Sequence, residues 1–213
     1  MKSIQGVVEA KCPHCSAAPF EAEVWSFIRA DSDPDLRDAV RYGELNLLEC
    51  EACGNFFYHE APVVYFDPEA ELLVFVMPHS YEAEAGKWRE KMKADYAAIR
   101  DGLSREMKID YEPLIFFGAE HLQQLLEDML DAEDENASIE AAALSLGFKI
   151  APFSPAKARA AGYPCRIPYA GAKPAPESFV NAALEILASG LESPKLKKLL
   201  ADVNSDAAKF PVR

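Results

Sequence analysis

Four of the five cysteines stand in two pairs, and the spacing within each pair is typical of metal ligands. The pairs are Cys12-Pro13-His14-Cys15 and Cys50-Glu51-Ala52-Cys53-Gly54. Two residues between the thiolates let both sulfurs reach one ion at about 2.3 Å, and two such pairs complete the tetrahedron of structural zinc sites. We therefore expect one structural zinc ion held by Cys12, Cys15, Cys50 and Cys53, and no catalytic or cofactor-binding residue.

The segment between the two pairs, residues 16–49, is longer than the roughly 15–20 residues usual in zinc ribbons. Loop-closure entropy grows only with the logarithm of length, so doubling the loop costs about 0.6 kcal/mol. Zinc binding contributes roughly 10–16 kcal/mol. The added length is therefore compatible with zinc, and the pattern places a strand and a short helix in it.

Redox chemistry is the alternative use of the first pair. Cys-Pro-His-Cys is also the active-site tetrapeptide of strongly oxidising thioredoxin-fold thiol oxidases, where the first cysteine begins a helix whose dipole lowers the thiol pKa. Here Pro19 and a strand-like alternation follow Cys15 instead of a helix. Zinc is favoured, and a thiol–disulfide oxidoreductase or redox sensor using Cys12 and Cys15 stays the alternative.

The remaining cysteine and the histidines carry weaker signals. Cys165 stands in a proline-rich stretch with no histidine near it in sequence, so we expect an ordinary thiol. We expect His14 to face solvent because four thiolates already fill the coordination sphere. His59, His79 and His121 lack a ligand residue four positions on, and the glutamates adjacent to His59 and His121 should point away from them.

The hydrophobic periodicity predicts strands in the first eighty residues and helices after them. Asp33 and Pro34 are typical of a helix start and Gly43 of a helix end, while a Pro68 turn should join the last two strands. Strands are expected at 4–10, 20–27, 45–49, 56–66 and 72–77; helices at 34–42, 81–103, 122–129, 138–147, 179–188 and 195–203, with the acidic run 128–135 as a solvated helix end and turn.

Composition limits the possible classes of protein. The chain has 213 residues, of which 50% are hydrophobic, and a net charge of −13, so it can bury a core and is not disordered. The charge is −9 in residues 1–80, −9 in 81–147 and +5 in 148–213. An acidic body argues against nucleic acid and anionic membranes as partners.

The same change of charge suggests the domain organisation. We expect a zinc-binding domain at 1–147 with its helical half from about 81, a proline-rich linker or arm at 148–176, and a short helical extension at 177–213. No signal-peptide-like or membrane-spanning apolar run is present, so a cytoplasmic location is expected, in which thiols stay reduced.

Both cysteine motifs resemble those of the bacterial CpXC domain family, named for a Cys-Pro-x-Cys element and including a later Cys-x-x-Cys-Gly. The helix start at Asp33-Pro34, the Gly43-Glu44-Leu45 segment and the hairpin up to Met77-Pro78 are also similar to that family. The resemblance covers about residues 1–147 and is best in 1–78. It implies zinc binding by the four cysteines and brings no established activity.

These observations together predict an α+β protein. The expected architecture is a small antiparallel sheet with a zinc-ribbon-like four-cysteine site, helices packed on the sheet, and a helical C-terminal extension. The expected function is a non-enzymatic, zinc-stabilised protein-interaction module whose partner is a protein, a second copy of the chain included. A nucleic-acid-associated ribbon using the basic C-terminal arm is the weaker alternative, and chelation should cause a cooperative loss of structure.

Overall fold

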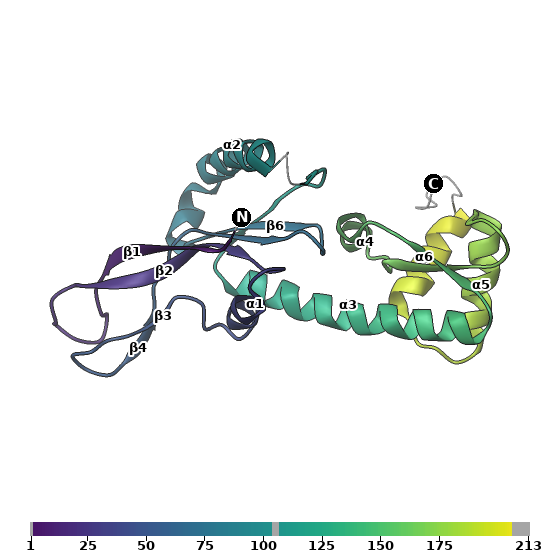
Figure 1. Cartoon of the computed structure of the whole chain (residues 1–213), viewed down its shortest axis with the longest axis horizontal. Helices are drawn as coiled ribbons and strands as arrows, with labels where there is room; N and C mark the ends of the chain where they lie inside the picture. Colours follow the sequence, from purple (N-terminus) through teal and green to yellow (C-terminus); the bar gives the residue numbers. More distant parts are fainter. Residues whose placement is uncertain (1, 104–106, 206–213) are drawn as a thin grey trace. The chain divides into compact units, whose positions relative to one another are not determined.

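The chain forms two compact units, and the boundary between Glu127 and Asp128 falls inside the long helix α3 (Glu120–Ser145) in the computed structural model (Figure 1). The structure describes residues 2–103 and 107–205. Before α3, the first unit contains β1 (Ile4–Ala10), β2 (Phe20–Arg29), α1 (Pro34–Arg41), β3 (Leu47–Glu49), β4 (Phe56–Tyr58), β5 (Val63–Asp67), β6 (Leu72–Met77), the 3-10 helix η1 (His79–Glu84), α2 (Ala85–Leu103) and β7 (Leu114–Phe117).

A five-stranded sheet in the order β1-β2-β5-β6-β7 is the scaffold of the first unit. The β1–β2 and β5–β6 neighbours are antiparallel, while β2–β5 and β6–β7 are parallel. Parallel neighbours need a crossover connection, and α1 with the β3–β4 hairpin forms the first, whereas η1 and α2 form the second. The predicted α+β class is confirmed, but the sheet is mixed rather than antiparallel because these connections cross over.

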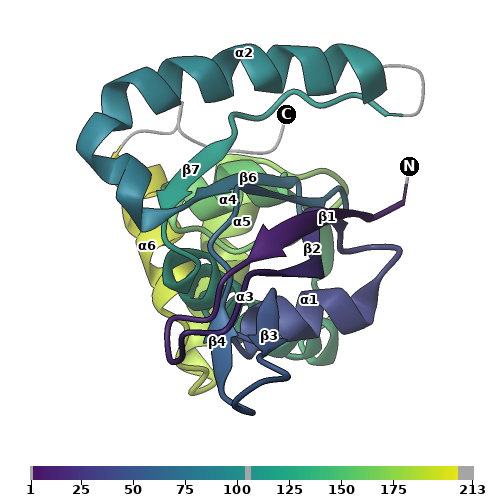
Figure 2. The ribbon, with the colours of Figure 1, turned by 90° about the vertical axis from the view of Figure 1, so that its left-hand side faces the viewer.

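Helix α2 covers one face of this sheet (Figure 2). Its side chains Trp88, Met92, Tyr96 and Ile99 pack against a core that includes Phe75 of β6. Tyr81 of η1 stacks on Trp88 with ring centroids 4.1 Å apart. These apolar side chains of the predicted helix 81–103 therefore form a core face. The buried residues of this core are Phe27, Phe66, Leu73, Phe75, Met77, Met92, Leu103, Ile109 and Phe117.

Several element boundaries differ from those expected. The predicted strand 56–66 is two strands, β4 and β5, and the four-residue strand β7 was missed because it is short and does not alternate. The helices expected at 122–129 and 138–147 are one helix, α3, and the acidic run 128–135 lies inside it rather than at a turn. No glycine or proline interrupts residues 119–146, so nothing in the local sequence ends the helix there.

The second unit contains elements where a linker or arm was expected. Strands β8 (Lys149–Pro152) and β9 (Arg166–Tyr169) pair antiparallel, with α4 (Pro155–Ala161) between them. The predicted C-terminal helices are α5 (Pro176–Ala188) and α6 (Pro194–Ser205). Two prolines of the expected arm, Pro155 and Pro176, begin helices here instead of extending the chain. The core of this unit contains Ile139, Ala143, Ile167, Phe179, Ala183, Ile186, Leu196, Leu199 and Val203.

Within residues 2–103 and 107–205, no helix is long and apolar enough to cross a membrane.

Candidate metal centre

The loops of two β-hairpins carry the four paired cysteines. Cys12 and Cys15 lie between β1 and β2, and Cys50 and Cys53 lie between β3 and β4. Both loops are at the same end of the first unit (Figure 1). The structure thus brings together the four residues that the sequence singled out, and their Sγ atoms all lie within 4.8 Å of one another.

The sulfur–sulfur distances fit a tetrahedral ion. Cys12 Sγ is 3.8 Å from Cys53 Sγ, and Cys15 Sγ is 3.7 Å from Cys50 Sγ. Four sulfurs placed tetrahedrally about 2.3 Å from one zinc are separated by about 3.8 Å. A disulfide needs a bond of about 2.05 Å, so the four thiols are free. The cluster could hold a metal ion with one ligand from each cysteine.

A small apolar core supports the cluster from one side. Cys12 and Cys50 are buried, at 3% and 1% exposure, and pack with Ala10 and Phe57. Phe57 meets Phe20 edge to face, with ring centroids 6.2 Å apart. Cys15 is half-buried and Cys53 is exposed. Two of the four sulfurs are therefore shielded by the protein, whereas the other two lie toward the surface.

Backbone and side-chain N–H groups surround the sulfurs. The Cys50 carbonyl accepts hydrogen bonds from the amides of Cys53 (3.2 Å) and Gly54 (2.7 Å), and Gly54 takes the positive φ (71°) that this turn requires. His14 N donates to Cys12 Sγ at 3.3 Å, and Asn55 Nδ2 donates to Cys53 Sγ at 3.4 Å. Such N–H···S contacts stabilise thiolates that share one ion.

The two sulfurs nearer the surface differ in acidity. The Asn55 amide, helped by hydrogen bonds from the other three cysteines and opposed by desolvation, lowers the pKa of Cys53 to about 7. For Cys15, the Ala17 amide lowers the pKa, but desolvation and hydrogen bonds with the other cysteines outweigh it and raise the pKa to about 11. Without an ion, Cys53 is thus the stronger acid of these two thiols.

Comparison with known proteins agrees with this geometry. A family model described as CpXC protein matches residues 10–137, which include both cysteine pairs and more than half of the chain. The chain belongs to the CpXC family. The matched segment of this CpXC chain ends within α3, so most of the second unit lies outside it. Neither the curated proteins nor the solved structures include a match.

One residue of the CpXC chain that sequence reasoning missed, Asn46, connects the cysteine-bearing β3–β4 hairpin to β2 of the five-stranded sheet. Asn46 Oδ1 accepts a hydrogen bond from Trp25 N at 2.7 Å, and its Nδ2 donates to Trp25 O at 3.0 Å. The Asn46 carbonyl also accepts from His59 N, across the base of the hairpin. Asn46 adopts a φ of 57°, a region that asparagine tolerates better than most residues.

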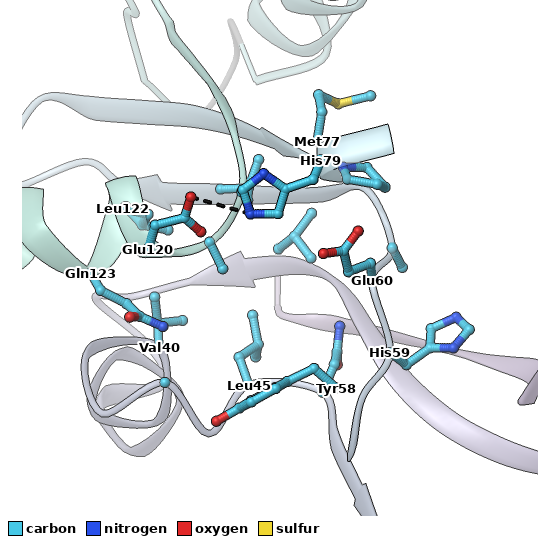
Figure 3. Close-up of a pocket in the computed structure, with 18 of the residues that line it drawn as sticks. Val40, Leu45, Tyr58, His59, Glu60, Met77, His79, Glu120, Leu122 and Gln123 are labelled. Carbon is cyan, nitrogen blue, oxygen red and sulfur yellow. Dashed lines mark ion pairs between the residues drawn. The ribbon is translucent and has the colours of Figure 1, made fainter. Parts of the chain in front are cut away.

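The other candidate residues of the CpXC chain lie outside the cluster. His14 is exposed, as expected. Cys165 belongs to the second unit, where its amide donates to Asn136 Oδ1 at 2.9 Å. His79 Nε2 lies 3.2 Å from Glu120 Oε1, a pairing that no local sequence pattern indicates (Figure 3). His121 Nε2 is 3.7 Å from the same oxygen, so this neighbouring pair lies closer together than expected.

Proposed function

We propose that this CpXC chain is a non-enzymatic protein-interaction module stabilised by one structural zinc ion, with Cys12, Cys15, Cys50 and Cys53 as the ligands. The observation that carries the proposal is the spacing of the four sulfurs, at 3.7 and 3.8 Å across the two pairs. Four thiolates in a tetrahedral arrangement favour zinc over the harder Mg²⁺ and Ca²⁺.

A non-enzymatic role follows from the ligand set. Catalytic zinc sites have three protein ligands and keep one position for water or substrate. Four cysteines leave no such position, so the ion contributes folding free energy rather than Lewis acidity. The function then depends on the surface that the ion holds in place.

Exposed aromatic side chains next to the cluster support a protein partner. On β4, Phe57 is buried, whereas its neighbours Phe56 and Tyr58 are 58% and 60% exposed. Aromatic residues that stay in water on a metal-stabilised hairpin are typical of contact surfaces. A second copy of the chain is one such partner. The acidic balance of residues 1–80 disfavours nucleic acid at this surface.

The second candidate function is thiol–disulfide exchange, and one observation favours it. Cys53 is exposed and has a pKa lowered to about 7, as reactive thiols have. The nucleophile expected from the sequence, Cys12, fits the chemistry less well because it is 3% exposed and lies between two strands rather than at a helix start.

Metal analysis combined with thiol counting on freshly purified protein separates the two candidates. The zinc proposal expects one zinc per chain and one readily titrated thiol, Cys165, which a Cys165→Ser control removes. It also expects Phe56→Ser to weaken self-association or partner binding without releasing zinc. Metal-free protein with a disulfide between Cys12 and Cys15 would instead favour redox chemistry.

A further inference from the structure

A cavity of about 420 Å³ in the first unit has no role in the proposed zinc site. It is bounded by α1, the β3–β4 hairpin, the start of β5, the end of β6 and the start of α3. Its volume lies in the range of small-molecule pockets, roughly 300–1,000 Å³. Val40, Val63, Val76 and Leu122, all buried, form an apolar floor. The floor suits the hydrocarbon part of a ligand.

Two carboxylates face this cavity. Glu60 comes from the β4–β5 connection and Glu120 from the first turn of α3, and in Figure 3 the Glu60 carboxylate points toward the Glu120–His79 pair, whereas the His59 ring points away. Within the described part of the chain, the lining includes neither lysine nor arginine. A phosphate or carboxylate would therefore meet repulsion here, while a cation would find two partners.

The structure holds Glu120 in a defined position. Its Oε1 pairs with His79 Nε2, and both side chains lie against Gly118, where any Cβ would overlap them. Gly118 also has a φ of 100°, which side chains rarely adopt. About one turn further along α3, Gln123 packs against Gly43, where a Cβ would lie 2.9 Å from its Nε2. The two glycines thus leave room for polar side chains at the cavity wall. Because these side chains are already held in place, less conformational entropy is lost when a ligand binds.

We propose that this cavity binds an organic cation, namely a primary alkylammonium or alkylguanidinium group carried on an apolar stem. The charged head lies between Glu60 and Glu120, and the stem lies on the valine floor. Tyr58, which is 60% exposed, also lines the cavity. The acidic balance of residues 1–80 raises the local concentration of cations. The ligand is either a free amine or a lysine or arginine side chain of another protein.

Titration of the 213-residue chain, with its zinc content known, tests the proposal. The probes are n-pentylammonium, n-butylguanidinium and an acetyl-Gly-Lys-Gly-amide peptide; 1-pentanol and acetate are the neutral and anionic controls. Binding is followed by NMR of the Val40, Val63 and Val76 methyl groups. Glu60→Gln and Glu120→Gln should each weaken cation binding about threefold, and the double variant about tenfold, because both carboxylates are partly exposed.

The matched control is Glu69→Gln, which removes the same charge from the exposed β5–β6 turn and should leave the affinity unchanged. Tighter binding of the peptide than of the free amines identifies a protein side chain as the natural ligand, and the reverse identifies a small molecule. The proposal is overturned if the cations leave the three valines unperturbed, if pentanol or acetate binds equally well, or if the double variant binds as the parent does. Measurement on zinc-loaded protein keeps such a failure separate from failure of the metal proposal.

Discussion

Removal of the proposed zinc ion should unfold the cysteine-bearing loops and the β3–β4 hairpin while the rest of the first unit stays folded. The small core around the cluster has one large buried side chain, Phe57, at 8% exposure. Burial of one such side chain contributes about 1.5–3 kcal/mol. A structural zinc contributes roughly 10–16 kcal/mol. The contribution of such an ion thus exceeds that of the apolar packing several-fold, and the packing alone is too weak to order two loops and a hairpin of two three-residue strands.

The larger core behaves differently because the cysteines are not part of it. Its nine buried residues lie between the five-stranded sheet and α2. From the sequence, chelation was expected to cause a cooperative loss of structure. On the basis of these separate cores, we now expect only a local loss of structure. Loss of β3 also removes Asn46 from Trp25, so the adjoining part of β2 should become less protected.

Hydrogen exchange measured by mass spectrometry on zinc-loaded and chelated protein, both kept reduced, is the assay. We expect β3–β4 and residues 11–19 to exchange at the rate of an unfolded peptide after chelation, whereas β5, β6 and α2 keep their protection. Protection of β3–β4 that persists without metal would refute the argument, since packing would then suffice. Simultaneous loss of protection in β5 and β6 would also refute the argument, since the larger core would then depend on the metal.

Three further perturbations test other parts of the structure. Asn46→Ala should destabilise the first unit by about 2–4 kcal/mol, because it removes two hydrogen bonds and leaves alanine with a positive φ. Asn46→Gly should destabilise it less, because glycine tolerates that φ, and chemical denaturation measures the free energy of unfolding of both variants. Glu135→Ala should cost about 1–3 kcal/mol by leaving the buried Ser193 hydroxyl without its acceptor, as thermal unfolding would report; an equal melting temperature would count against this. Burial and then the hydrogen bond to Asp202 raise the pKa of Tyr163 from 10.0 to about 12, so its contribution to stability is present below pH 10 and lost as the pH rises to about 12. Burial also raises the pKa of Tyr65 and of Tyr96, so absorbance titration should show several late tyrosines, and Asp202→Asn should shift one of them to lower pH.

The elements that follow local rules were predictable. Strands β1 and β6 have the predicted bounds, and α1 begins at Pro34 after Asp33 as the sequence indicated. These local signals act over a few neighbouring residues, so the sequence alone reveals them. They are hydrophobic alternation in strands, the helical period, proline at a helix start and glycine at a helix end. The prediction was wrong where local rules compete. Acidic residues resemble a helix end, yet 128–135 continues α3 because the residues around it favour helix.

The chemistry of the candidate site was likewise fixed by residue type and spacing alone. Two Cys-x-x-Cys pairs determine that four sulfurs are available in two close pairs, whatever the fold. Tertiary structure decided that the contacts run between the pairs, Cys12 to Cys53 and Cys15 to Cys50, because the β1–β2 loop of the five-stranded sheet meets the loop of the separate two-stranded β3–β4 sheet. It also decided the hydrogen bonds between Asn46 and Trp25 and the His79–Glu120 pair, which join residues far apart in sequence. Such contacts depend on the order in which the crossover connections place the strands in the mixed sheet, and the local hydrophobic periodicity does not indicate that order.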